Sequence, residues 1–198
     1  MLRNRAETTA PGIGPREEPT GAYVIDPDHS AIGFSVRHAM VTNVRGRFRA
    51  FEGFLRLDGL RPGRSEAHVS VQTGSLDTGA RARDSHITGP DFLDAATFPL
   101  MVFRSTAVVP VGEDTFRMTG SLRIKDVELP LRIDLDYGGC GIDAHGQRRV
   151  GFEGAATLRR SDWGLGWNVP LTAGGLLLSD TVRLELSVSA LRLGRGAA

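Results

Sequence analysis

One segment of the sequence places charged and histidine-bearing residues directly before aromatic and apolar ones. It spans 80–105 and opens with Arg81, Arg83, Asp84 and His86. Its second half carries the large apolar side chains Phe92, Leu93, Phe98, Met101 and Phe103. Arginine and histidine can hydrogen-bond a polar headgroup, and large apolar side chains can cover a hydrocarbon chain. The segment therefore suits a molecule that has a polar head and an apolar body.

A catalytic interpretation of the same segment is weaker. Asp84, Ser85 and His86 have the residue types of a nucleophilic triad, but sequence neighbours seldom supply its geometry. The Gly-x-Ser-x-Gly elbow is also missing from the sequence. We predict a protein that is not an enzyme. The alternative is an enzyme that uses Asp84 and His86 on an apolar substrate.

Metal and nucleotide sites lack their usual patterns. The histidines occur singly, without a His-x-His or His-Glu-x-x-His pair, at positions His29, His38, His68, His86 and His145. The sequence leaves open whether His29, His38 and His86 converge in space. The glycines of 164–166 lack the further glycine and the strand-to-helix setting of a phosphate loop. We predict no metal and no cofactor.

Composition restricts the partners and the location. The 198 residues carry 24 basic and 23 acidic side chains, with no basic run interleaved with aromatics, so nucleic acid is not an expected partner. The single cysteine, Cys140, cannot form an intrachain disulfide. Residues 1–20 contain no apolar run of signal-peptide or membrane-span length, and we expect a disordered tail there and a cytoplasmic location. Residues 21–198 are expected to form one domain.

The elements that must position these residues are β-strands, because apolar and polar residues alternate with period two. In the second half the alternation predicts strands within 116–125, 131–137, 150–158 and 182–190. In the first half it predicts strands at 23–26, 32–38, 45–58, 66–73 and 100–109. The apolar parity shifts inside 45–58, which indicates a β-bulge near 50–53. One helical segment is expected at 79–89. This pattern fits a sandwich or an up-and-down barrel, which periodicity does not distinguish.

Several spaced motifs give the sequence a family resemblance. They occupy 23–38, 44–48, 51–53, 75–79, 83–86, 91–94, 98–105, 120–124 and 160–165. In this order they resemble the YceI-like family of polyisoprenoid-binding, lipocalin-like proteins, over about 22–193. The resemblance implies an all-β, extended antiparallel β-barrel of about eight strands with a short helical insertion. It further implies an apolar interior that binds an isoprenoid or similar amphipathic lipid, and a homodimer.

The resemblance turns the residues above into candidate ligand contacts. We predict that the protein carries or stores a long-chain isoprenoid in the barrel. The headgroup candidates are His38, Arg81, Arg83, Asp84 and His86. The candidates for the apolar tunnel are Phe34, Val36, Phe48, Phe92, Phe98, Met101, Phe103, Phe152 and Trp163.

Three alternatives stay open at this point. Arg83 and Asp84 could instead pair with the scaffold and hold the helical insertion. Trp163 is equally well explained as core and as pocket wall. A structural or stress-related module, with the barrel filled by its own side chains, is the third alternative. The sequence also departs from the family at Lys125 and Asp126, where relatives often have His-Gly, so a different turn is expected there.

Overall fold

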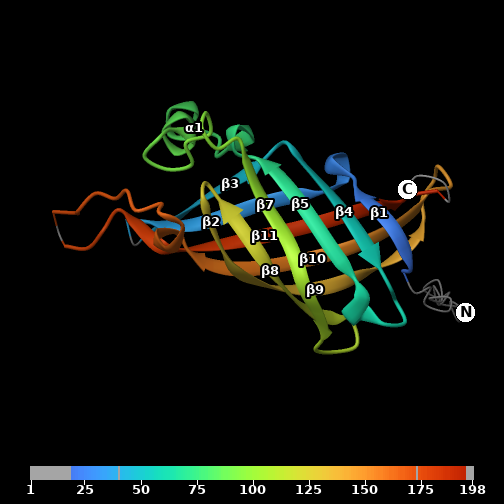
Figure 1. Cartoon of the computed structure of the whole chain (residues 1–198). Helices are drawn as coiled ribbons and strands as arrows, with labels where there is room; N and C mark the ends of the chain where they lie inside the picture. Colours follow the sequence, from blue (N-terminus) through green and yellow to red (C-terminus); the bar gives the residue numbers. More distant parts are fainter. Residues whose placement is uncertain (1–18, 40, 173, 195–198) are drawn as a thin grey trace, which may run out of the picture.

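The computed structural model describes residues 19–39, 41–172 and 174–194, and within them eleven strands form one antiparallel sheet (Figure 1). The predicted tail, 1–20, lies outside the described residues except for its last two. The strands are β1 (Gly21–Ile25), β2 (Ala31–His38), β3 (Thr42–Phe48), β4 (Phe51–Leu57), β5 (Glu66–Gln72), β6 (Leu76–Asp77), β7 (Leu100–Pro110), β8 (Thr115–Ile124), β9 (Val127–Ile142), β10 (Arg148–Arg159) and β11 (Leu178–Arg192).

The sheet closes into a barrel. The neighbours run in the order β1, β4, β5, β7, β8, β9, β10 and β11, and β1 pairs again with β11 to complete a ring of eight strands. Strand β2 continues along β11 beyond β1, β3 pairs with β2, and β6 pairs with β3. This closed antiparallel, lipocalin-like barrel confirms the predicted fold and excludes the sandwich. Closure gives each of the eight ring strands a neighbour on both sides, while β6 ends the sheet beyond the ring.

Short helical segments interrupt or connect the strands. The predicted helical insertion is confirmed as α1 (Arg81–Thr88). Four 3-10 turns accompany it: η1 (Pro27–His29), η2 (Pro62–Arg64), η3 (Thr73–Ser75) and η4 (Arg160–Trp163). Turn η1 separates β1 from β2 because Pro27 fixes its backbone and the Asp26 carboxylate accepts a hydrogen bond from the Asp28 amide at 3.1 Å.

The predicted strand over 45–58 is broken into β3 and β4. The break falls at Arg49 and Ala50, beside the position where the apolar parity shifts. Both amides are bonded to Ser75, the Arg49 amide to its carbonyl at 3.1 Å and the Ala50 amide to its hydroxyl at 3.0 Å. The break lets β4 stay in the ring while β3 continues past the ring with β2.

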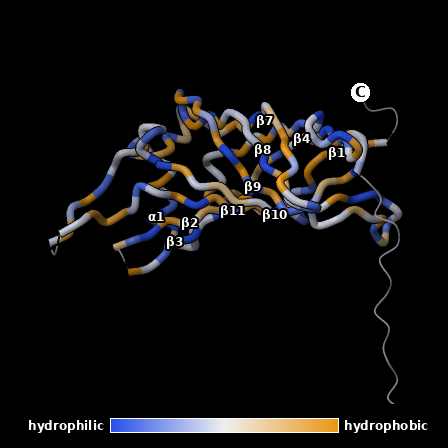
Figure 2. The backbone as a smooth tube through the Cα atoms, turned by 90° about the horizontal axis from the view of Figure 1, so that it is seen from below, coloured by the Kyte–Doolittle hydropathy of each residue, from blue (hydrophilic) through white to orange (hydrophobic). Residues whose placement is uncertain are grey.

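Apolar side chains inside the barrel form two clusters, in keeping with the alternation of hydrophobic and hydrophilic residues along the strands (Figure 2). The larger cluster lies towards α1 and includes Leu93, Leu131 and Trp163. The smaller one surrounds Tyr23 and Ala190, which are both fully buried. Phe51, Val69 and Met118 pack against both clusters and join them inside the barrel.

The turn between β8 and β9 contains Lys125 and Asp126, where the sequence predicted an unusual turn. These two residues alone connect Ile124 to its partner Val127. Lys125 has φ 56°, a left-handed conformation that tight hairpins usually give to glycine or asparagine. Its ammonium group lies 5.8 Å from the centre of the Phe98 ring.

Candidate functional site

An apolar cavity of about 330 Å³ lies inside the barrel. Every strand of the eight-strand ring contributes to its wall, because each strand turns one of its two faces inward. The apolar wall consists of Ile25, Leu55, Leu57, Ala67, Val69, Phe103, Val108, Phe116, Met118, Ile133, Leu135, Tyr137, Phe152, Leu186 and Val188. Such a wall suits a hydrocarbon chain.

Polar residues line the cavity at one end only, which we call the acidic rim. The acidic rim consists of Asp58, Glu66, Glu113 and Asp114, and Ser65 lies among them. These residues come from the β4–β5 connection with the first residue of β5, and from the β7–β8 turn. Helix α1 lies beyond the opposite ends of the strands, since β7 starts beside the α1 segment and ends at the β7–β8 turn (Figure 1).

Two carboxylates of the acidic rim are tied to arginines that do not line the cavity. Asp58 accepts a hydrogen bond from the Arg61 side chain at 3.1 Å, and Glu66 accepts one from Arg56. The Asp58 carboxylate also accepts from the backbone amide of Arg61 at 3.0 Å. Hydrogen-bond acceptors therefore border the cavity at this end. The arginines bonded to Asp58 and Glu66 are not part of the cavity lining.

Arg83 and Asp84, two of the predicted headgroup residues, contact Thr78 just after β6. The Arg83 guanidinium donates to the Thr78 hydroxyl at 2.7 Å and to its carbonyl oxygen at 2.9 Å. The Asp84 carboxylate accepts from the Thr78 amide at 2.9 Å. These bonds anchor α1 to the barrel, as the scaffold alternative described.

The other predicted headgroup residues also lie away from the cavity wall. His86 is bonded to Asp91 at 3.1 Å and packs against the rings of Phe92 and Trp167, with centroid distances of 5.2 and 4.6 Å. Arg81 begins α1, and His38 ends β2 opposite Thr42. A role of these residues in ligand binding stays a prediction.

Two of the predicted tunnel residues, Phe103 and Phe152, line the cavity. Phe48 and Trp163 belong to the larger cluster, and Phe34 and Met101 pack against it. Val36 lies on β2 opposite Val44 and Val182. Phe92 is buried beside His86, and Phe98 lies below Lys125. The sequence prediction missed the aliphatic wall residues, although the alternation within 116–125 and 131–137 already placed several of them on one strand face.

A second cavity, of about 430 Å³, lies where β9 and β10 separate. Their pairing ends at Asp134 and Ala155, although both strands continue. Leu131, Ala156, Leu158 and Trp163 are buried lining residues, and charged side chains surround them: Arg132, Asp134, Arg159, Asp162 and Arg183. The Trp163 indole donates to the Leu122 carbonyl oxygen at 3.0 Å, which fixes the ring inside the barrel.

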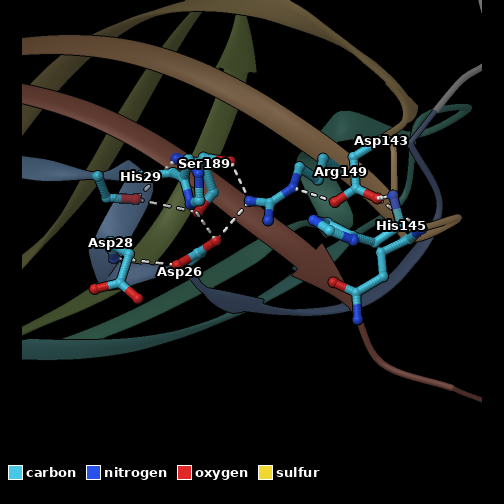
Figure 3. Close-up of polar contacts among 9 residues, drawn as sticks. Asp26, Asp28, His29, Asp143, His145, Arg149 and Ser189 are labelled. Atoms are coloured by element: carbon cyan, nitrogen blue, oxygen red, sulfur yellow. Dashed lines mark hydrogen bonds and ion pairs between the residues drawn. The ribbon is translucent and has the colours of Figure 1, made fainter.

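A group of ion pairs joins η1 to the β9–β10 turn (Figure 3). The Arg149 guanidinium lies 2.6 Å from a carboxylate oxygen of Asp26 and 2.7 Å from one of Asp143. The hydrogen bond from Arg149 lowers the pKa of Asp143 to about 2 and lowers the pKa of Asp26. His29 adds a contact of 2.8 Å to Asp26. None of these residues lines the apolar cavity, and their bonds tie the β1–β2 connection to the β9–β10 turn.

The described part of the chain contains neither a metal-binding cluster nor a membrane-spanning helix. Within 19–39, 41–172 and 174–194, no three His, Cys, Asp or Glu side chains gather where they could hold a metal ion. In the same ranges, no helix has the length and apolar content needed to cross a membrane.

Comparison with known proteins identifies the family. The model of the YceI-like domain matches residues 23–190. The chain belongs to the YceI-like family. It is 36% identical over 170 residues to a UPF0312 protein of Azotobacter vinelandii, covering 83% of this chain and 88% of that protein. A UPF0312 protein of Pseudomonas savastanoi is 37% identical over 145 residues, covering 72% of this chain and 76% of that protein.

Two solved structures share the fold. BcnA of Burkholderia cenocepacia superimposes with a TM-score of 0.74 at 21% identity, covering 83% of this chain and 98% of that one. A polyisoprenoid-binding domain of Saccharophagus degradans, implicated in plant cell wall breakdown, gives a TM-score of 0.67 at 16% identity over 86% of this chain and 98% of that one. At these identities the similarity shows that the barrel fold is shared.

Proposed function

We propose that the protein binds a long-chain isoprenoid or similar amphipathic lipid in the apolar cavity, without transforming it. The observation that carries this proposal is the cavity wall, to which all eight strands of the ring contribute apolar side chains. Each buried methylene stabilises a complex by about 0.8 kcal/mol. Several isoprene units in this cavity therefore outweigh the entropy lost on binding. The structural similarity to a polyisoprenoid-binding domain of Saccharophagus degradans supports the same ligand class.

The size of the cavity limits how the lipid lies. About 330 Å³ is at the lower end of ligand pockets, which span roughly 300–1,000 Å³. Phe103 and Ile133 belong both to the cavity wall and to the larger apolar cluster. Side-chain movement at this boundary would admit a longer chain towards Trp163. Without such movement, the cavity holds only one part of a long isoprenoid chain.

The alternatives receive less support. Asp84 is bonded to Thr78 and His86 to Asp91, and neither lines the cavity, so an enzyme using this pair would need a different substrate position. A barrel filled entirely by its own side chains would not leave the cavity beside the smaller cluster. A homodimer and a cytoplasmic location stay predictions, for which light scattering and cell fractionation are the direct measurements.

The proposal is tested by extracting the purified protein with organic solvent and identifying retained lipid by mass spectrometry. We expect an isoprenoid or related lipid, recovered chemically unchanged after incubation with the protein. Ala67, which lines the cavity on β5, offers a blocking variant, Ala67→Phe. The exposed Ala107 on β7 offers the matched control, Ala107→Phe. An empty protein that also takes up no added polyprenol would contradict the proposal.

A further inference from the structure

The acidic rim restricts which polar group the bound lipid carries, an inference that rests on the proposed function. Among the described residues that line the apolar cavity, there is no lysine, arginine or histidine. The charged side chains in the lining are Asp58, Glu66, Glu113 and Asp114. The cavity itself is the binding site, and these carboxylates decide the environment of any polar group left at its open end.

The rim offers acceptors rather than donors. An ionised carboxylate only accepts hydrogen bonds, and the hydroxyls in the lining belong to Ser65 and Tyr137. The Ser65 hydroxyl oxygen already accepts from the Asp58 amide at 3.1 Å. The Ser65 and Tyr137 hydroxyls are the side-chain donors among the described lining residues, set against four carboxylates. A phosphate or carboxylate at this end would therefore mostly meet carboxylates, with which an ionised acid cannot form hydrogen bonds.

Arg61 and Arg56, which are bonded to two of the rim carboxylates, do not reverse this effect. Arg61 bonds Asp58 and Arg56 bonds Glu66, and both arginine side chains are more than half exposed to solvent. The Asp58 side chain is only 19% exposed and adjoins the apolar wall. Charges next to a wall of low polarity act more strongly than charges in water, so Asp58 outweighs its solvent-facing partner inside the cavity.

We propose that the cavity selects lipids whose polar end donates hydrogen bonds, an alcohol, phenol, amide or amine, and discriminates against phosphates and carboxylates. The arginines Arg81 and Arg83 do not change this selection, because they lie at the α1 end. The hydroxyl of a neutral isoprenoid alcohol can donate a hydrogen bond to a rim carboxylate. The ammonium group of an amine also donates, and its positive charge is attracted to the carboxylates. A phosphate brings its negative charge next to them.

The test measures calorimetric binding of farnesol, farnesylamine and farnesyl phosphate to the full chain at pH 7.5, below the concentration at which they form micelles. We expect the alcohol and the amine to bind, and the phosphate to bind at least about tenfold more weakly. Added salt should narrow the difference between amine and phosphate. A phosphate that binds as tightly as the alcohol would overturn this inference and leave the proposed function intact. Failure of all three to bind would overturn both.

Charge reversal at the rim supplies the second readout. Glu113→Lys should strengthen binding of farnesyl phosphate and weaken binding of farnesylamine, each at least about threefold, with farnesol little changed. The control is Glu128→Lys, at an exposed position of β9 outside the cavity lining, which should change none of the three affinities. Equal responses of the two variants would show that overall charge, and not the rim, sets the preference.

Discussion

The ring of Phe103 lies directly over Gly120, its near neighbour on the adjacent strand β8. A Cβ atom at Gly120 would come within 2.5 Å of the Phe103 ring, closer than real side chains approach. Phe103 is buried and lines the apolar cavity. Because glycine has no side chain, Gly120 leaves room for the Phe103 ring in the cavity wall.

Gly120→Ala should destabilise the barrel and change the cavity together. The added methyl group would lie 2.3 Å from the Arg104 carbonyl oxygen and 2.5 Å from the Phe103 ring, so both the β7 backbone and the ring must shift. Overpacking of this kind costs about 1–3 kcal/mol of unfolding free energy. Urea denaturation measures the first effect and farnesol titration the second. The control is Gly141→Ala on β9, where a Cβ would meet nothing within 4 Å. Identical behaviour of the two variants would contradict this account of the wall.

The ion pairs of Arg149 should make stability depend on acid pH. The pKa of Asp143 is lowered from 3.8 to about 2, and that of Asp26 is lowered as well, chiefly by hydrogen bonds from Arg149. A carboxyl group whose pKa is lower in the folded state stabilises the fold above its unfolded value and loses this contribution as the pH falls through the folded one. The melting temperature should therefore fall between pH 4 and pH 2.

Arg149→Met should flatten this acid dependence, because the carboxylates then lose their shared partner. The variant should also melt at a lower temperature than the parent at pH 7, where both ion pairs are formed. Arg117→Met removes an exposed ion pair with Asp134 and is the matched control, expected to leave the acid profile unchanged. Thermal unfolding followed by circular dichroism at several pH values makes the comparison. A parent profile that stays flat down to pH 2 would contradict the link.

The sequence alone predicted the strands well, because burial of one strand face imposes the period-two pattern directly. It placed a β-bulge near 50–53 from the change of parity, whereas the structure ends β3 at Phe48 and starts β4 at Phe51. Local pattern could not show that the β4–β5 and β7–β8 turns meet at the cavity opening, which depends on the pairing of β5 with β7 across the α1 segment. For the same reason, Arg83 and Asp84 stood out as charged neighbours, while their bonds to Thr78 became visible only in three dimensions.

Asp84→Ala separates the anchoring of α1 from ligand binding. The substitution removes the acceptor of the Thr78 amide, and an unsatisfied donor costs about 1–3 kcal/mol where it is buried. Hydrogen exchange should therefore speed up in α1 and around Thr78. Farnesol affinity should stay unchanged because Asp84 lies outside the cavity lining. A marked loss of affinity would instead support the headgroup role that the sequence predicted.

Trp163 should be the costliest single truncation in the larger cluster. Its side chain is 4% exposed and its indole nitrogen donates to the Leu122 carbonyl oxygen at 3.0 Å. Trp163→Ala removes this bond and leaves a cavity, for about 3–5 kcal/mol of unfolding free energy. Trp163→Phe keeps most of the packing and should lose only about 1–2 kcal/mol, the contribution of the hydrogen bond and part of the ring.

The chain has two tryptophans, so Trp167 still reports unfolding in both Trp163 variants by fluorescence. Trp163 also lines the second cavity, between β9 and β10. If a longer isoprenoid reaches past Phe103 towards Trp163, the smaller ring introduced by Trp163→Phe should favour longer chains over farnesol in competition experiments. Equal unfolding free energies for the Ala and Phe variants would show that Trp163 does not support the barrel by packing.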